Sequence, residues 1–156
     1  MSFWSRGGPP AKTLDDLLPP VPAANSERFA FATHDPHPSA LLTHGHVDHV
    51  MGMGPFADEA KERGAPPIEI VAHENAPARF ERYARTAGWH GCINSRQFSM
   101  RVRWPTTYPR PDRLVRDRYS LALGDGRTLE LFHDRGETDD HLWIWLPRER
   151  AITALK

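Results

Sequence analysis

The order of apolar and polar positions predicts a mixed α/β chain with short strands and two helices. Runs of about five residues that are apolar, or that alternate apolar and polar, are typical of strands. Such runs cover residues 29–33, 39–43, 68–72, 119–123, 128–132, 142–146 and 151–155. The run at 142–146 is apolar on both faces, which predicts a central strand. Gly124 and Gly126 predict a hairpin between 119–123 and 128–132.

Two segments carry the signals of helices. Pro55 suits a first helical turn and Gly64 suits the position after a last turn, so a helix is predicted over 55–63. A second helix is predicted over 76–87, where apolar residues recur with helical spacing and form one buried stripe. Residues 89–111 show no clear period, and we expect an irregular stretch there of the kind that often forms a functional loop.

Length and composition indicate one domain with an arm in front of it. The chain has 156 residues, which is long enough for a real core. Residues 1–26 are rich in proline, glycine and alanine, so they predict an extended arm. Residues 27–156 are expected to form the domain.

The charge balance indicates which partners the chain lacks, and the cysteine content indicates the cellular compartment. Lys+Arg and Asp+Glu are both 20, so no basic excess indicates binding to nucleic acid or to an anionic membrane. The single cysteine, Cys92, excludes an intrachain disulfide and fits a reducing compartment. No apolar run approaches the roughly 20 residues of a membrane span, and no secretory signal is visible. We therefore expect a cytoplasmic protein that binds neither nucleic acid nor membrane.

The candidate chemistry lies directly after the predicted strand at 39–43. Four residues with metal-binding side chains fall within six positions: His44, His46, Asp48 and His49. Imidazole and carboxylate groups are ligands that Zn²⁺ prefers. His44 and His46 are two residues apart, so in extended backbone they lie on one face. Because the other two follow after the turn, the spacing predicts two adjacent metal sites.

Two motifs resemble those of the metallo-β-lactamase-fold hydrolases. The segment THGHVDH resembles their HxHxDH signature, and HDRGETDDHLWIWLP, residues 133–147, resembles their next metal-binding motif. Most members have a Gly-His pair in the second motif, whereas this chain has Glu137, which is similar to the alkyl sulfatase branch. The resemblance covers about residues 39–155 and implies an αββα sandwich.

The resemblance also implies a ligand set and a reaction. It assigns His44, His46 and Glu137 to a first zinc ion, and it assigns Asp48 and His49, with a later histidine, to a second. In such sites a metal-bound hydroxide is the nucleophile, because the metal lowers the pKa of water from about 15.7 towards about 7. Asp48 is expected to orient this hydroxide. The implied activity is zinc-dependent hydrolysis of a small anionic or ester-type substrate, such as a sulfate ester.

Three further residues are candidates for the site. His141 is expected to orient the ligands from behind, or to be a ligand itself. His133 stands at a strand end and is expected to be a structural histidine, with a role behind the ligands as the alternative. Arg96 is a candidate for holding an anionic substrate, because a guanidinium matches sulfate or phosphate oxygens. The alternative for Arg96 is a plain surface arginine.

The resemblance implies that further parts of the family fold follow the two motifs. An acid that bridges the two metal ions is expected at or just past Lys156, and the later histidine of the second site is expected beyond it. The chain is therefore expected to form the front portion of the fold, with open sheet edges that favour a homo-oligomer. One alternative to an active hydrolase is a metal-binding fragment that is inactive or depends on a partner. Another is a relative with one iron ion that oxidises sulfur compounds.

Overall fold

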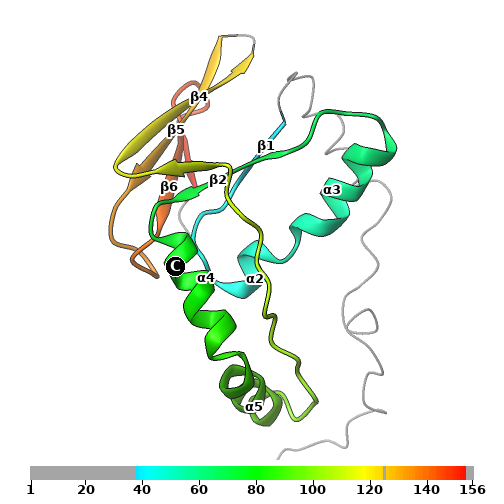
Figure 1. The fold of residues 1–156 in the computed structure, drawn as a ribbon. Coiled ribbons are helices and arrows are strands. Elements are labelled where there is room, and N and C mark those ends of the chain that lie inside the picture. The colour runs from blue at the N-terminus through cyan, green and yellow to red at the C-terminus, as the bar shows by residue number, and fades with distance from the viewer. Residues whose placement is uncertain (1–37, 125, 154–156) are drawn as a thin grey trace, which may run out of the picture.

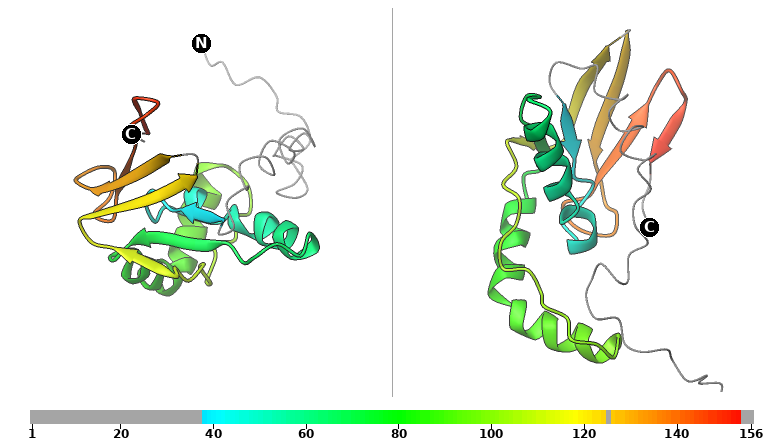
Figure 2. Two further views of the ribbon diagram at one scale, coloured as in Figure 1. Left: turned by 90° about the horizontal axis from the view of Figure 1, so that it is seen from above. Right: turned by 90° about the vertical axis from the view of Figure 1, so that its right-hand side faces the viewer.

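The structure, a computed structural model, describes residues 38–124 and 126–153. The predicted arm and the predicted strand at 29–33 lie outside these residues. In the part that is described, two sheets face each other and helices cover the outer side of one of them (Figure 1, Figure 2). Among the same residues, no helix has the length and apolar character needed to cross a bilayer.

The first sheet has three parallel strands in the order β1-β2-β3, which are Ser39–Leu41, Glu69–His73 and Arg113–Val115. Parallel neighbours need long crossover connections, and these are usually helical. The first crossover contains α2 (Val47–Val50) and α3 (Met53–Glu62). The second contains α4 (Ala76–Arg85) and α5 (Ala87–Gln97).

The second sheet has four antiparallel strands in sequence order. They are β4 (Arg118–Gly124), β5 (Arg127–His133), β6 (Leu142–Leu146) and β7 (Ala151–Thr153). β6 pairs with both β5 and β7, so the prediction of a central strand at 142–146 is confirmed. The predicted hairpin between β4 and β5 is also confirmed, and Gly124 and Gly126 have φ angles of 78° and 70°. Glycine adopts this left-handed region without steric cost.

The core has two layers because β2 presents alternate side chains to opposite faces. Val71 packs with Leu131 and Leu142 between the two sheets. Ala72 packs with Phe80 of α4 on the helical side. All five side chains are buried. The first sheet is therefore covered on both faces, which a parallel sheet requires.

Most predicted elements are confirmed, one of them with an earlier end, and one prediction is wrong. The predicted strands at 39–43, 68–72, 119–123 and 128–132 and the helix at 55–63 match β1, β2, β4, β5 and α3 to within a few residues. The helix predicted over 76–87 ends at Arg85, where the hydroxyl of Thr86 donates to the carbonyl of Arg82. The stretch predicted to be irregular is helical up to Gln97. The short strand β3 was not predicted.

The mixed α/β class is confirmed. The described layers are helices, then the three-stranded sheet, then the four-stranded sheet (Figure 2). An outer helical layer on the four-stranded sheet, which an αββα sandwich also has, is not among residues 38–124 and 126–153.

A main-chain contact joins the two sheets next to the candidate site. The chain turns after β1 at Thr43, whose carbonyl accepts the N–H of Leu142 at the start of β6, with an N···O distance of 2.7 Å. The loop after β1 and the loop before β6 therefore meet at a fixed point. These two loops carry the two motifs that the sequence contains.

Candidate metal centre

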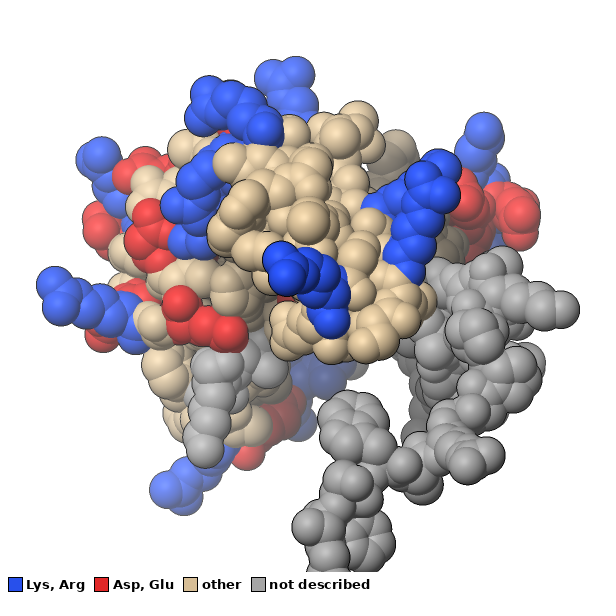
Figure 3. All heavy atoms as spheres, turned by 90° about the horizontal axis from the view of Figure 1, so that it is seen from below, with Lys and Arg blue, Asp and Glu red and all other residues tan. Residues whose placement is uncertain are grey.

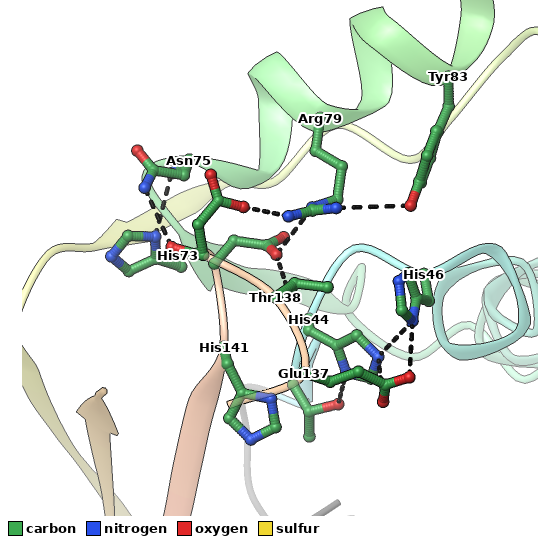
Figure 4. A network of polar contacts seen from close by, with 12 residues as sticks. His44, His46, His73, Asn75, Arg79, Tyr83, Glu137, Thr138 and His141 are labelled. Carbon is green, nitrogen blue, oxygen red and sulfur yellow. Dashed lines mark hydrogen bonds and ion pairs between the residues drawn. The ribbon is translucent and has the colours of Figure 1, made fainter. Parts of the chain in front are cut away.

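Three side chains from these two loops bring their metal-binding atoms together (Figure 4). Nε2 of His44 lies 3.1 Å from Nδ1 of His46 and 3.5 Å from Oε2 of Glu137. Nδ1 of His46 lies 3.3 Å from Oε1 of Glu137. Ligand atoms held about 2.0–2.1 Å from a tetrahedral zinc ion are roughly 3.3 Å apart. The three donors therefore have the spacing and the chemistry of one metal site.

His44 is held as a neutral ring with one nitrogen directed at the other donors. Its side chain is buried, and its Nδ1 lies 3.2 Å from the hydroxyl oxygen of Thr43. Burial, and then the neighbouring His49 and His46, lower the pKa of His44 from 6.5 to about 4. A neutral ring that donates its Nδ1–H to Thr43 keeps a lone pair on Nε2. Metal-binding histidines are oriented in this way by a hydrogen bond from their other nitrogen.

Asp48 and His49 lie beside the first group, on the short helix α2. The ring centroid of His49 is 4.4 Å from that of His44, and its Nε2 lies 3.5 Å from Oδ2 of Asp48. The Asp48 side chain is exposed. Two donors of the expected second site are thus adjacent to the first site. Within residues 38–124 and 126–153, no third His, Cys, Asp or Glu completes a group with them.

An arginine of α4 holds the loop before β6 in place. Arg79 donates from Nε to Oδ1 of Asp140 at 2.9 Å, and its Nη2 pairs with Oδ1 of Asp139. Asp140 is fully buried and also accepts the hydroxyl of Thr138 (Figure 4). A buried carboxylate with two charge-assisted or hydroxyl donors is well stabilised. The network therefore fixes the three residues that directly follow the candidate ligand Glu137.

Gly45 lets the turn between His44 and His46 close on this network. A Cβ atom at Gly45 would lie 2.6 Å from Cδ of Arg79 and 2.7 Å from Oδ2 of Asp140. Any side chain there would displace the buried ion pair. The glycine between the two histidines is thus required by the close approach of α4 and the loop before β6.

His141 lies under the turn that carries Glu137. It is fully buried, and in the described part of the chain neither ring nitrogen has a hydrogen-bond partner. Its ring stacks against His44 with a centroid distance of 5.5 Å, and a Cβ atom at Gly136 would overlap it. Burial lowers the pKa of His141, although the neighbouring Asp140 acts in the opposite direction. A neutral imidazole here fits both roles expected for His141.

His133 and His73 form a separate stacked pair with a centroid distance of 3.8 Å. Nδ1 of His133 lies 3.0 Å from the carbonyl of His141. Nε2 of His73 lies 3.0 Å from the carbonyl of Arg116, and its Nδ1 accepts the N–H of Asn75. These contacts hold strand ends together, which is the arrangement of structural histidines.

Arg96 lies away from the three donors, at the exposed end of α5. This helix follows α4 at the far end from the loop before β6 (Figure 1). None of the described contacts joins Arg96 to the metal-binding group, so its role in substrate binding stays a prediction.

The sequence analysis missed two residues that support the candidate ligands, Thr43 and Arg79. One feature of the sequence could have indicated Arg79. It stands one position before Phe80, at the margin of the apolar stripe of α4, where a side chain can reach a neighbouring element.

A family model matches the part of the chain that carries this centre. The model of the metallo-beta-lactamase superfamily matches residues 39–153, well over half of the sequence. The chain belongs to the metallo-beta-lactamase superfamily. The match includes all three donor residues, and it agrees with the family that the two motifs predicted.

Solved structures of this superfamily are similar to the chain. The BLEG-1 B3 metallo-beta-lactamase has 18% identity and a TM-score of 0.46, and the match covers 84% of this chain and 55% of that one. A metallo-beta-lactamase superfamily protein from the archaeon Sulfolobus tokodaii has 14% identity and a TM-score of 0.44, with coverage of 70% and 42%. The chain thus spans about half of the length of these structures.

Two curated proteins match shorter segments. An adenine deaminase of Kosmotoga olearia is 34% identical over 71 residues, which are 46% of this chain and 11% of that protein. An adenine deaminase of Desulfatibacillum aliphaticivorans is 46% identical over 48 residues, which are 31% of this chain and 8% of that protein. The chain therefore corresponds to a small part of these longer relatives.

Proposed function

We propose that the chain is a metal-dependent hydrolase with zinc bound by His44, His46 and Glu137. The observation that carries this proposal is the convergence of two imidazoles and one carboxylate from loops of two different sheets, with 3.1–3.5 Å between each pair of groups. Membership of the metallo-beta-lactamase superfamily supports it. The neutral state of His44 supports it as well, because a histidine binds a metal only when its ring nitrogen is free of a proton.

The residues of the chain suit hydrolysis by an activated water. A bound divalent ion lowers the pKa of water and stabilises negative charge on the group under attack. Thr43 and the Arg79–Asp140 pair hold the ligands in place. Asp48 is exposed beside the centre, where its carboxylate can orient a water and accept its proton. The same pair of residues, Asp48 with His49, is the proposed start of a second zinc site.

The proposed substrate is a small anionic or ester-type molecule, with a sulfate ester as the first choice. This choice depends on the resemblance of the Glu137 motif to the alkyl sulfatase branch. Arg96 is the proposed anion-binding residue. We further propose a cytoplasmic location and self-association through an open sheet edge, because β7 is an edge strand of the described sheet.

The alternative function is a metal-binding chain that is inactive alone or depends on a partner. The specific observation behind it is that Asp48 and His49 find no third donor among the described residues. Under this alternative the first site still binds metal, whereas turnover requires groups supplied by another chain.

Elemental analysis of protein purified without chelators tests the proposal, together with hydrolysis of the nitrophenyl sulfate, acetate and phosphate esters. We expect at least one zinc ion per chain and measurable turnover. Glu137→Ala and His44→Ala are expected to lower metal affinity and kcat/KM by more than about 100-fold, because even residues behind metal ligands contribute 10- to 100-fold. Glu149→Ala removes an exposed carboxylate of the turn after β6 and serves as the matched control.

The outcomes separate the two functions. Metal in the wild type without turnover on any ester supports the partner-dependent alternative. Protein that binds no zinc, or activity that survives both ligand substitutions, contradicts the proposed centre itself.

A further inference from the structure

The charges of this chain are balanced overall but not locally. Residues 82–111 contain no aspartate, glutamate or lysine. They contain six arginines: Arg82, Arg85, Arg96, Arg101, Arg103 and Arg110. A segment of 30 residues with this composition is strongly electropositive. The balanced charge of the whole chain, which predicted no binding to nucleic acid or to an anionic membrane, does not reveal this segment.

Within residues 38–124 and 126–153, no carboxylate forms an ion pair with these arginines. Elsewhere, Arg79, Arg113, Arg116 and Arg118 each form an ion pair with an aspartate or glutamate. Among the residues that the structure describes, none of the six arginines of 82–111 has such a partner, and all six are exposed. Their positive charge is therefore available to a partner of opposite charge.

Large apolar side chains are exposed in the same region. Trp89 is 63% exposed, Phe98 59% and Ile93 39%. We give the name α5 tip to this region, which is defined by Trp89, Ile93 and Phe98 and by the exposed Arg101 and Arg103 that follow α5. It lies at the end of the molecule remote from the two sheets (Figure 1). Seen from below, the molecule presents a broad area without acidic side chains, with basic side chains on it and beside it (Figure 3).

We propose that the α5 tip docks on the surface of an anionic lipid bilayer. In this position Trp89, Ile93 and Phe98 enter the headgroup layer, and the arginines lie against lipid phosphates. Proteins that lie on a membrane combine buried apolar area with attraction to anionic lipids. Tryptophan is favoured at the membrane–water interface. No described helix spans a bilayer, and the proposal requires only contact with one leaflet.

The exposed arginines favour a partner that carries negative charge. Among such partners, the exposed apolar side chains favour a lipid surface, because a bilayer offers them an apolar environment. A nucleic acid would neutralise the arginines through its phosphates, and its bases could stack on Trp89 or Phe98. A nucleic acid would not, however, provide an apolar environment for the aliphatic side chain of Ile93. A bilayer accommodates the aliphatic and the aromatic side chains together. The projection of the tip away from the sheets allows this contact without moving the metal centre.

Sedimentation of the full chain with vesicles tests this proposal. Vesicles of phosphatidylglycerol and phosphatidylcholine are compared with vesicles of phosphatidylcholine alone. We expect binding only to the anionic vesicles, and binding that weakens as salt is added. Trp89→Ser with Phe98→Ser should lower the bound fraction at least tenfold. Arg101→Gln with Arg103→Gln should weaken binding by about fivefold per charge.

Matched controls make the result specific to the tip. Leu114→Ser with Ile152→Ser removes two other exposed apolar side chains, at 53% and 60% exposure. Arg127→Gln with Arg150→Gln removes two exposed charges near the four-stranded sheet, one from β5 and one from the turn before β7. Both controls should leave vesicle binding within about twofold of the wild type. A single-stranded oligonucleotide is included as a competing anionic partner.

Three outcomes would overturn the proposal. The first is no binding to anionic vesicles at low salt, or equal binding to both vesicle types. The second is an equal loss of binding in the tip variants and in the control variants. The third is tighter binding to the oligonucleotide than to the vesicles, which would assign the tip to nucleic acid. Because none of these variants alters a metal ligand, their results are independent of the proposed hydrolase activity.

Discussion

At the scale of single residues, we expect the proposed centre to depend on side chains that contact the loops carrying the candidate ligands. Asp140 is fully buried and accepts hydrogen bonds from Arg79 and Thr138, whereas Asp139 contacts the same arginine from an exposed position. Hydrogen bonds to buried charged groups contribute about 1.5–3 kcal/mol, while exposed ion pairs contribute up to about 1 kcal/mol. The two adjacent aspartates therefore have unequal roles.

Substitution of these aspartates measures that difference. Asp140→Asn should lower the free energy of unfolding by about 2 kcal/mol and weaken zinc binding by about 10- to 100-fold. Asp139→Asn should change the free energy of unfolding by less than about 1 kcal/mol. Denaturant unfolding and zinc titration against a competing chelator give both quantities. Similar effects of the two substitutions would contradict a positioning role for Asp140.

We expect His73 to make the stability of the fold depend on pH. Burial, and then the neighbouring His133, lower the pKa of His73 below its ordinary 6.5. Protonation would also remove the acceptor that Nδ1 offers to the N–H of Asn75. Its contribution to stability is therefore complete above about pH 6.5 and is lost as the pH falls below that value.

The pH dependence is measured by denaturant unfolding with chelator present, so that zinc does not contribute. We expect the wild type to lose stability between pH 7 and pH 5. His73→Gln should be less stable at pH 7 and should lose less on acidification, because the titrating group is gone. Equal slopes of unfolding free energy against pH in the two proteins would exclude His73 as a source.

At the scale of elements, sequence patterns identified those whose apolar residues have a regular period. Alternation located β4 and β5, and the helical stripe that includes Phe80 and Tyr83 located α4. The pattern failed for α5, because its apolar residues follow no single stripe and several of them are exposed. Burial against the core produces a period, and α5 projects from the core. The short strand β3 has only one buried residue, Val115, which is too little to produce a pattern.

The three candidate donors could be predicted from the sequence, whereas the residues that hold them in place could not. His44 and His46 are two residues apart, which any extended backbone places on one face. The motif around Glu137 indicated the third donor through resemblance. The position of Arg79 beside the apolar stripe was only a weak signal, because its role depends on the approach of α4 to the loop before β6, which is a tertiary contact. Local sequence motifs therefore indicate the candidate ligands, whereas the residues that support them depend on tertiary contacts.

At the scale of the whole molecule, the proposed metal centre lies between the two sheets. His44 and His46 follow β1 of the three-stranded sheet, and Glu137 precedes β6 of the four-stranded sheet. Between the sheets, Val71 packs against Leu131 and Leu142, and one main-chain bond closes the edge near the site. An ion held by donors from both loops would bind only when the two sheets are docked. Metal binding should therefore stabilise the whole fold.

Thermal unfolding at increasing zinc concentration tests this link. A ligand that binds only the folded state at 100 times its Kd adds about 2.7 kcal/mol to stability. We expect the unfolding temperature of the wild type to rise with zinc and to fall again when chelator is added. In Glu137→Gln, the donor from the four-stranded sheet loses its charge and much of its affinity, so the rise should largely disappear. An equal rise in that variant would mean that zinc binds within one sheet, on the histidine loop alone, and the centre would not join the two sheets.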